Sequence, residues 1–245
     1  MKRIYIILIA ALLLQACSMS KEDSSPQQTT GQGGSLARFT IVGNYLYTVD
    51  ESSLNTYTID NAAQPAFIKR ISLGFGTETI FPYKNALLLG TEEGMYVYDI
   101  SHPESPQQVT LFQHIRSCDP VVAENDYAYI TLNSNNTRCW RGLDELQVVD
   151  LHNLSSPYMV SSYNLTSPKG LEIHNDTLFV CDDGIRMLSV ANKNSPLELA
   201  HYYSISANDL IYTQGRLLAI GPDGFSQYSI NQDGLSLLST IPVEP

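Results

Sequence analysis

The sequence predicts an all-β fold, a single five-bladed β-propeller whose blades each have four strands. Three observations lead to this prediction. A motif recurs five times at a spacing near 40 residues. The segments around it are short and rich in Val, Ile, Tyr and Thr, and no stretch after the first 34 residues sustains the 3.6-residue period of a helix. A repeat of this length with four strand-like runs is typical of a propeller blade.

The recurring motif is anchored on one apolar position. Its five copies are TYTIDNAAQPAFI (56–68), VYDISHPESPQQV (97–109), VVDLHNLSSPYMV (148–160), MLSVANKNSPLEL (187–199) and QYSINQDGLSLLS (227–239). The aligned anchors, which are spaced by 41, 51, 39 and 40 residues, are Ile59, Ile100, Leu151, Val190 and Ile230. In the first four copies a proline follows the anchor by six positions, and these prolines are Pro65, Pro106, Pro157 and Pro196. The fifth copy has Ser236 there, as a terminal repeat can.

The other strands of each blade lie around this motif. An apolar run precedes each anchor: YLYTV from Tyr45, ALLLG from Ala86, YAYIT from Tyr127, TLFVC from Thr177 and RLLAI from Arg216. A first run lies further upstream, such as RFTIV from Arg38, and a fourth follows the proline, such as QQVTLF from Gln107. Gly, Asn, Asp or Pro bounds each run, which is the pattern of short strands joined by turns.

The motif and its neighbours resemble the LVIVD-repeat proteins. The resemblance is carried by VYDISHPESP and by GGSLARFTI, TETIFPYKNALLLGTEEGMYVYDI, HIRSCDPVV and DELQVVDL. The last four look like segments of envelope lipoproteins of that family, in the same order, and the resemblance covers essentially all of 33–243. The resemblance implies a propeller fold and a place in the Gram-negative cell envelope. It implies no established biochemical activity.

The N-terminus predicts export and lipid anchoring. Lys2 and Arg3 precede the apolar run 4–14, and the next residues, through Cys17, resemble the lipobox of bacterial lipoproteins. That resemblance implies cleavage before Cys17 and attachment of the chain to the membrane by acyl chains on this residue. The predicted organisation is a signal peptide at 1–16, a lipidated cysteine and disordered tether at 17–34, and the propeller at 35–245.

The composition of the tether and the net charge of the chain indicate where the protein is located and which partners it can bind. Residues 18–34 are mostly Ser, Gln, Thr and Gly, a composition that does not form a packed core. Lys21-Glu22-Asp23 either resembles a short acidic surface-export tag or is a solvated charge cluster, so the expected location is the outer membrane, with surface display left open. Loss of Lys2 and Arg3 with the signal peptide takes the formal charge from −11 to −13. Such an acidic chain is not expected to bind nucleic acid.

The starts of the inner strands predict a polar site at one mouth of the central channel. The loops that join consecutive blades share a face with the loops between the second and third strands. Aligned by the second strand, the inner strands start with two columns of residues: Ala37, Glu78, Asp119, Lys169 and Asn208, then Arg38, Thr79, Pro120, Gly170 and Asp209. We expect either a ligand or cation site built from Glu78, Asp119 and Asp209 with Arg38 and Lys169 as countercharges, or the same groups pairing with one another in a wet channel.

An insertion in the third blade points to the same face. The long third spacing comes from NSNNTRCWRGLDE (133–145), which carries Cys139, Trp140 and Arg141. Cys118 starts the inner strand of that blade, and exported proteins meet oxidising conditions, so we expect a Cys118–Cys139 disulfide and a buried free thiol at Cys181. The predicted partner-binding sector is listed here: His114, Arg116, Asp119, Trp140 and Arg141. The alternative is that Trp140 folds inward and plugs the channel mouth.

No motif in the sequence predicts catalysis, a metal or a cofactor. The five histidines lack metal-ligand spacing, and no nucleophile-elbow, phosphate-loop or dinucleotide fingerprint is present. The predicted function is therefore a non-catalytic binding or assembly module for an envelope protein or a glycan. The alternative is a glycan-active hydrolase with two of Glu78, Asp119 and Asp209 as acid and base, which the separation of the carboxylates would reveal.

Overall fold

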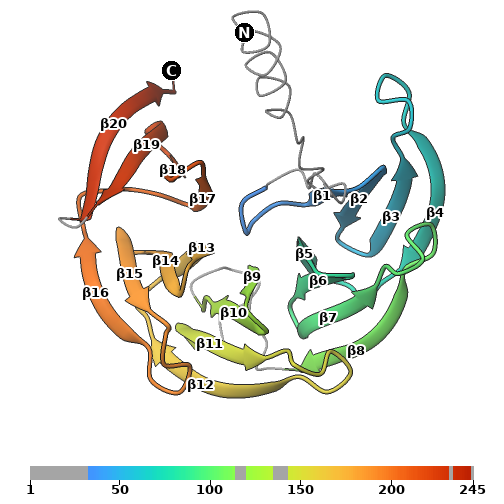
Figure 1. Cartoon of the computed structure of the whole chain (residues 1–245), viewed down its shortest axis with the longest axis horizontal. Helices are drawn as coiled ribbons and strands as arrows, with labels where there is room; N and C mark the ends of the chain where they lie inside the picture. The colour runs from blue at the N-terminus through green and yellow to red at the C-terminus, as the bar shows by residue number, and fades with distance from the viewer. Residues whose placement is uncertain (1–32, 114–119, 135–142, 232–233, 244–245) are drawn as a thin grey trace, which may run out of the picture.

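The computed structural model describes residues 33–113, 120–134, 143–231 and 234–243. These residues form twenty strands and no helix, in five antiparallel sheets of four. The sheets follow one another around a central axis, with the first strand of each innermost (Figure 1). The prediction of an all-β, five-bladed propeller is confirmed. Among the described residues no helix is long and apolar enough to span a membrane.

The strands of each blade are consecutive in the chain. Blade one contains β1 (Phe39–Val42), β2 (Tyr45–Asp50), β3 (Ser53–Thr58) and β4 (Ala66–Ser72). Blade two contains β5 (Thr77–Tyr83), β6 (Ala86–Thr91), β7 (Gly94–Asp99) and β8 (Gln107–Gln113). Blade three contains β9 (Val121–Glu124), β10 (Tyr127–Leu132), β11 (Glu145–Asp150) and β12 (Tyr158–Asn164). Blade four contains β13 (Pro168–His174), β14 (Thr177–Asp182), β15 (Ile185–Ser189) and β16 (Leu197–Tyr202). Blade five contains β17 (Asp209–Thr213), β18 (Arg216–Gly221), β19 (Gly224–Asn231) and β20 (Gly234–Pro242).

Local sequence explains the turns on the face away from the channel mouth. A two-residue turn joins the first and second strands of every blade. In three blades both turn residues have positive φ: Asn125-Asp126, Asn175-Asp176 and Gln214-Gly215. Such turns match the twist of the strands they join and favour Asn, Asp and Gly. The repeat prolines also have a clear role, because each lies directly before an outer strand, where no ladder hydrogen bond is lost.

Every blade carries a β-bulge at the same place. The register between the third and fourth strands shifts three residues before the repeat anchor in all five blades: Thr56/Tyr57, Val97/Tyr98, Val148/Val149, Met187/Leu188 and Gln227/Tyr228. A bulge bends the strand and increases its twist. The repeat thus specifies the curvature of each outer strand as well as its position.

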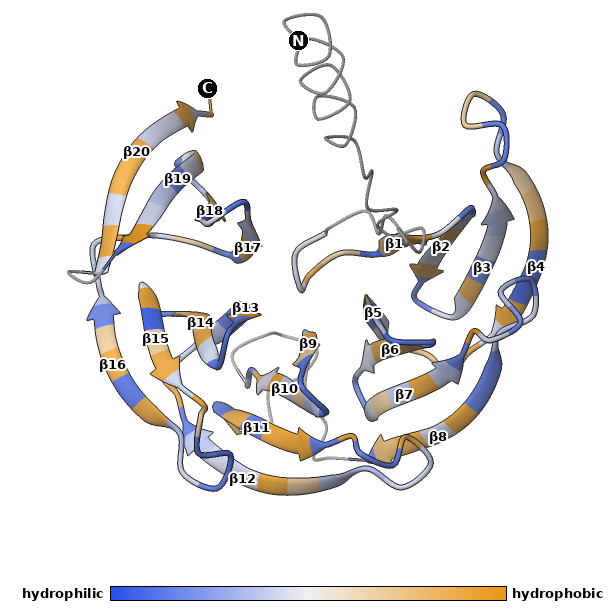
Figure 2. Cartoon of the chain, in the orientation of Figure 1, coloured by the Kyte–Doolittle hydropathy of each residue, from blue (hydrophilic) through white to orange (hydrophobic). Residues whose placement is uncertain are grey.

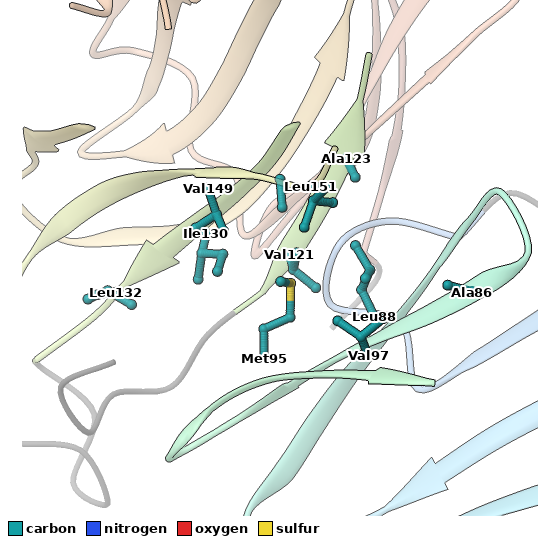
Figure 3. Close-up of a cluster of buried hydrophobic side chains, with 11 residues drawn as sticks. Ala86, Leu88, Met95, Val97, Val121, Ala123, Ile130, Leu132, Val149 and Leu151 are labelled. Carbon is teal, nitrogen blue, oxygen red and sulfur yellow. The ribbon is translucent and has the colours of Figure 1, made fainter. Parts of the chain in front are cut away.

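Four buried apolar clusters join consecutive blades, from one–two through to four–five. Between blades two and three, Leu88 and Met95 pack with Val121 and Ile130 (Figure 3). Because strands alternate their side chains, each sheet has one face for the preceding blade and one for the next. Figure 2 shows the resulting hydrophobic colour on the middle strands, such as β7 and β11.

The junction between blades five and one is packed differently. The inner-strand position that faces the preceding blade is buried in blades two to five, at Ile80, Val121, Leu171 and Leu210. The equivalent residue in blade one, Phe39, is 56% exposed. The second-strand position that faces the following blade is buried in blades one to four, at Tyr47, Leu88, Tyr129 and Phe179. The equivalent in blade five, Leu218, is only partly buried, and Ile220 two residues on is 39% exposed. Apolar side chains on both sides of this junction therefore remain partly in solvent.

Candidate functional site

The inner strands start around a small cavity at the channel mouth. The cavity has a volume of about 240 Å³ and is lined by Leu36, Glu78, Pro120, Asn133, Pro168, Lys169 and Asn208. These residues come from the segment before β1, the starts of β5, β9, β13 and β17, and the loop after β10. The structure thus brings together Glu78, Lys169 and Asn208 from the predicted first column. Hydrophilic colour on β13 and β17 marks this inner region in Figure 2.

Hydrogen bonds hold the cationic side of the cavity. The Nζ of Lys169 donates to Oδ1 of Asn208 at 2.8 Å. The backbone oxygen of Lys169 accepts from the hydroxyl of Thr131 at 2.7 Å, and Asn133 Nδ2 donates to the backbone oxygen of Pro168. Blades three, four and five are therefore connected at this rim. Lys169 itself is exposed, so its ammonium group can contact a ligand in addition to its bond with Asn208.

Asp209 is buried, does not line the cavity and has a different environment. Its carboxylate accepts hydrogen bonds from the hydroxyl of Ser35 at 2.9 Å, the amide of Leu36 at 3.2 Å and its neighbour Leu210 at 3.0 Å. Ser35 in turn accepts from the amide of Leu171 at 2.8 Å. Burial raises the pKa of Asp209, although these hydrogen bonds oppose the shift. Asp209 therefore ties the segment before blade one to blades four and five.

Two glycines make this close approach possible. A Cβ on Gly34 would lie 2.1 Å from Oδ2 of Asp209, and one on Gly170 would lie 2.3 Å from Oδ1. Neither position has room for a side chain. Arg38, the other predicted countercharge, is exposed and is not among the residues that line the cavity.

The remaining predicted residues lie outside the described part of the chain. They are Cys17, His114, Arg116, Cys118, Asp119, Cys139, Trp140 and Arg141. The two ends of the blade-three insertion are described, and they meet: Asp144 accepts from the amide of Ser134 at 2.9 Å and from its hydroxyl at 2.7 Å. The insertion therefore leaves and rejoins the blade on the channel face. Cys181 is buried with a free thiol, as predicted.

One buried carboxylate was not predicted. Glu172 on β13 is 7% exposed and accepts from the amides of Ile173 and Tyr212, both at 3.1 Å, which connects blade four to blade five. Burial raises the pKa of Glu172 to about 7. The sequence signal that could have identified Glu172 is an acidic residue between two apolar ones in the segment LEI (171–173). Within the described ranges, no three His, Cys, Asp or Glu side chains are grouped as a metal site.

Comparison with known proteins supports the repeat and the fold. The family model of the LVIVD repeat matches residues 116–165. No curated protein sequence matches the chain significantly.

Similar solved structures share the fold at low identity. A protein from Lactobacillus plantarum has a TM-score of 0.65 at 11% identity, over 81% of this chain and 69% of its own. The periplasmic gluconolactonase of Pseudomonas aeruginosa has a TM-score of 0.64 at 13% identity, over 82% and 68%. BamB from Moraxella catarrhalis has a TM-score of 0.53 at 13% identity, over 82% and 59%. At such identities the likeness concerns the fold alone. The chain is a five-bladed β-propeller with an LVIVD repeat in its third blade.

Proposed function

We propose that this protein is an outer-membrane lipoprotein whose propeller binds an envelope protein or a glycan at the channel mouth, without catalysis. The observation that carries the proposal is the cavity where Glu78, Lys169 and Asn208 converge from three blades. An acid, a base and an amide on a rigid scaffold can recognise a polar partner, because each is held at the start of a strand. The ends of the only long blade insertion in the repeat pattern lie on the same face.

The alternative, glycan hydrolysis, draws less support from the geometry. It requires two carboxylates beside an open cleft. Asp209, one of three candidates, is buried outside the cavity lining and already accepts three hydrogen bonds. Glu78 lines the cavity, and Asp119 lies outside the described residues.

Site-specific crosslinking in intact cells tests the proposal. A photoreactive residue in place of Glu78 should yield an adduct with the partner. The matched control is the same residue in place of Glu104, an exposed acid in the connection between β7 and β8 on the opposite face. Adducts at position 104 but none at position 78 would place the interaction elsewhere.

The anchor and the disulfide belong to the same proposal. Cys17→Ala should move the protein from the membrane fraction to the soluble fraction or block its maturation. Peptide mapping without reductant should recover Cys118 joined to Cys139, and two free thiols there would refute the bridge.

A further inference from the structure

We propose that a second cavity, formed by blade four and the loops on either side of it, is a binding site for a neutral saccharide, with Tyr203 as the stacking platform. This inference goes beyond the proposed function, because it concerns a different cavity, which shares only Lys169 with the channel-mouth cavity, and because it specifies the ligand class. The cavity has a volume of about 450 Å³, within the range of about 300–1,000 Å³ for small-molecule sites. Its lining comprises Thr166, Ser167, Lys169, Cys181, Asp183, Gly184, Tyr203, Ser206 and Ala207.

The aromatic platform is exposed and yet fixed in place. Tyr203 is 70% exposed, and its ring stacks on His201 with 3.7 Å between centroids. Nε2 of His201 lies 2.9 Å from the backbone oxygens of both Asp182 and Asp183, so the imidazole is held to the turn after β14. An aromatic ring supported in this way offers apolar contact area at little entropic cost. The ring face of a sugar, which carries C–H groups, is a suitable partner for it.

The opposite walls are also held before any ligand arrives. Asp182 is fully buried, and its Oδ1 accepts from the amides of Thr166 at 2.8 Å and Ser167 at 2.6 Å. Its other oxygen pairs with Arg186 at 2.9 Å. These contacts fix the loop between β12 and β13 against β14, so the site needs little ordering on binding.

The polar groups suit a ligand that is neutral and rich in hydroxyls. Lys169 and Asp183 supply one positive and one negative charge, which disfavours a strongly charged ligand of either sign. The hydroxyls of Thr166 and Ser206 can each donate and accept, as the hydroxyls of a sugar do. At the floor, burial raises the pKa of the Cys181 thiol, so this sulfur stays protonated and acts as an apolar surface instead of a nucleophile.

The aromatic platform is specific to blade four. In the strand register, the positions equivalent to Tyr203 lie opposite the start of the third strand and are occupied by Ser72, Gln113, Asn164 and Pro242. The repeat fold therefore does not require an aromatic residue here.

Saturation-transfer NMR on the full-length mature protein in detergent tests the inference, with maltotetraose, chitotetraose and mannotriose as probes. At least one of these saccharides should receive saturation transfer from the protein. Tyr203→Ala should raise the Kd for that saccharide at least tenfold. Tyr203→Phe should stay within threefold of wild type, because the ring and not the hydroxyl forms the platform. Ser206→Trp, which fills the cavity, should also abolish transfer.

Phe75→Ala, which removes another exposed aromatic side chain, is the matched control and should leave the Kd unchanged. No transfer from any probe, or equal Kd values for wild type and Tyr203→Ala, would overturn the inference. Neither result bears on adducts at position 78, so the two proposals fail separately.

Discussion

Two acidic residues of the inner strands show how strongly position within a strand decides the role of a carboxylate. Glu78 starts a strand and lines the channel-mouth cavity. Glu172, further along its strand, is buried between blades and accepts two backbone hydrogen bonds. The hydrogen bonds stabilise its charged form, but desolvation is the larger effect and raises its pKa to about 7.

This raised pKa predicts a pH dependence of stability. The folded state binds the Glu172 proton more tightly than the unfolded state, whose carboxyl titrates near 4.5. The free energy of unfolding should therefore be unaffected by this group below pH 4.5, fall as pH rises from 4.5 to 7, and level off above that. The total loss is up to about 3 kcal/mol.

Urea unfolding at pH 5 and pH 8 measures this effect. Wild type should lose stability between pH 5 and pH 8. This loss should be larger than the loss in Glu172→Gln over the same range, because Gln does not titrate. Gln also loses one of the two backbone hydrogen bonds, so the comparison is between pH values and not between proteins. Equal pH dependence in the two proteins would show that Glu172 is ionised across this range.

At the scale of elements, the strands could be predicted well because their determinants are local. All five second strands begin where the apolar runs begin, at Tyr45, Ala86, Tyr127, Thr177 and Arg216. Turn residues, β-branched runs and the repeat period all act within one blade. Glu78, Lys169 and Asn208 of the predicted column line one cavity for the same reason, since equivalent positions in repeated blades meet around the axis.

Contacts between residues far apart in the chain could not be predicted from the sequence. Ser35 and Asp209 are 174 positions apart, and nothing in either neighbourhood indicates that the first would cover the second. The stacking of Tyr203 on His201 was equally hidden, because it depends on the path of a loop between blades. Repeat analysis also treats all blades as equivalent, so it does not reveal that the first and last junction faces stay partly exposed.

Two leucines at equivalent positions give a matched test of blade packing. Leu88 and Leu218 occupy the same place on the second strands of blades two and five, but only Leu88 is fully buried. Leu88→Ala should destabilise the protein by about 2–5 kcal/mol, through lost burial and the cavity left behind. Leu218→Ala should cost no more than about 1.5 kcal/mol. Similar losses in urea unfolding would mean that blades five and one pack as tightly as the other pairs.

At the scale of the whole molecule, the ring is a series of blades joined face to face. Each of the four clusters draws side chains from two neighbouring sheets, so a middle blade is supported from both sides. Blades one and five each have one such neighbour. The contacts of Asp209 with Ser35 and Leu36 supply a polar connection between the two ends of the series.

This unequal support has a kinetic consequence for the native protein. A blade held on one face can open as a separate foldon, at a lower free energy than global unfolding. Amides of β18 should therefore exchange with deuterium faster than those of β10, although both are second strands paired antiparallel on both edges. Mass-spectrometric exchange on the native protein measures the difference, and equal protection in the two strands would contradict it.

The opening of the last blade would also affect the saccharide cavity. Because Tyr203 lies in the loop that leads into β17, this opening would dismantle one wall of the cavity. The lifetime of a bound sugar would then be limited by how long that blade stays closed.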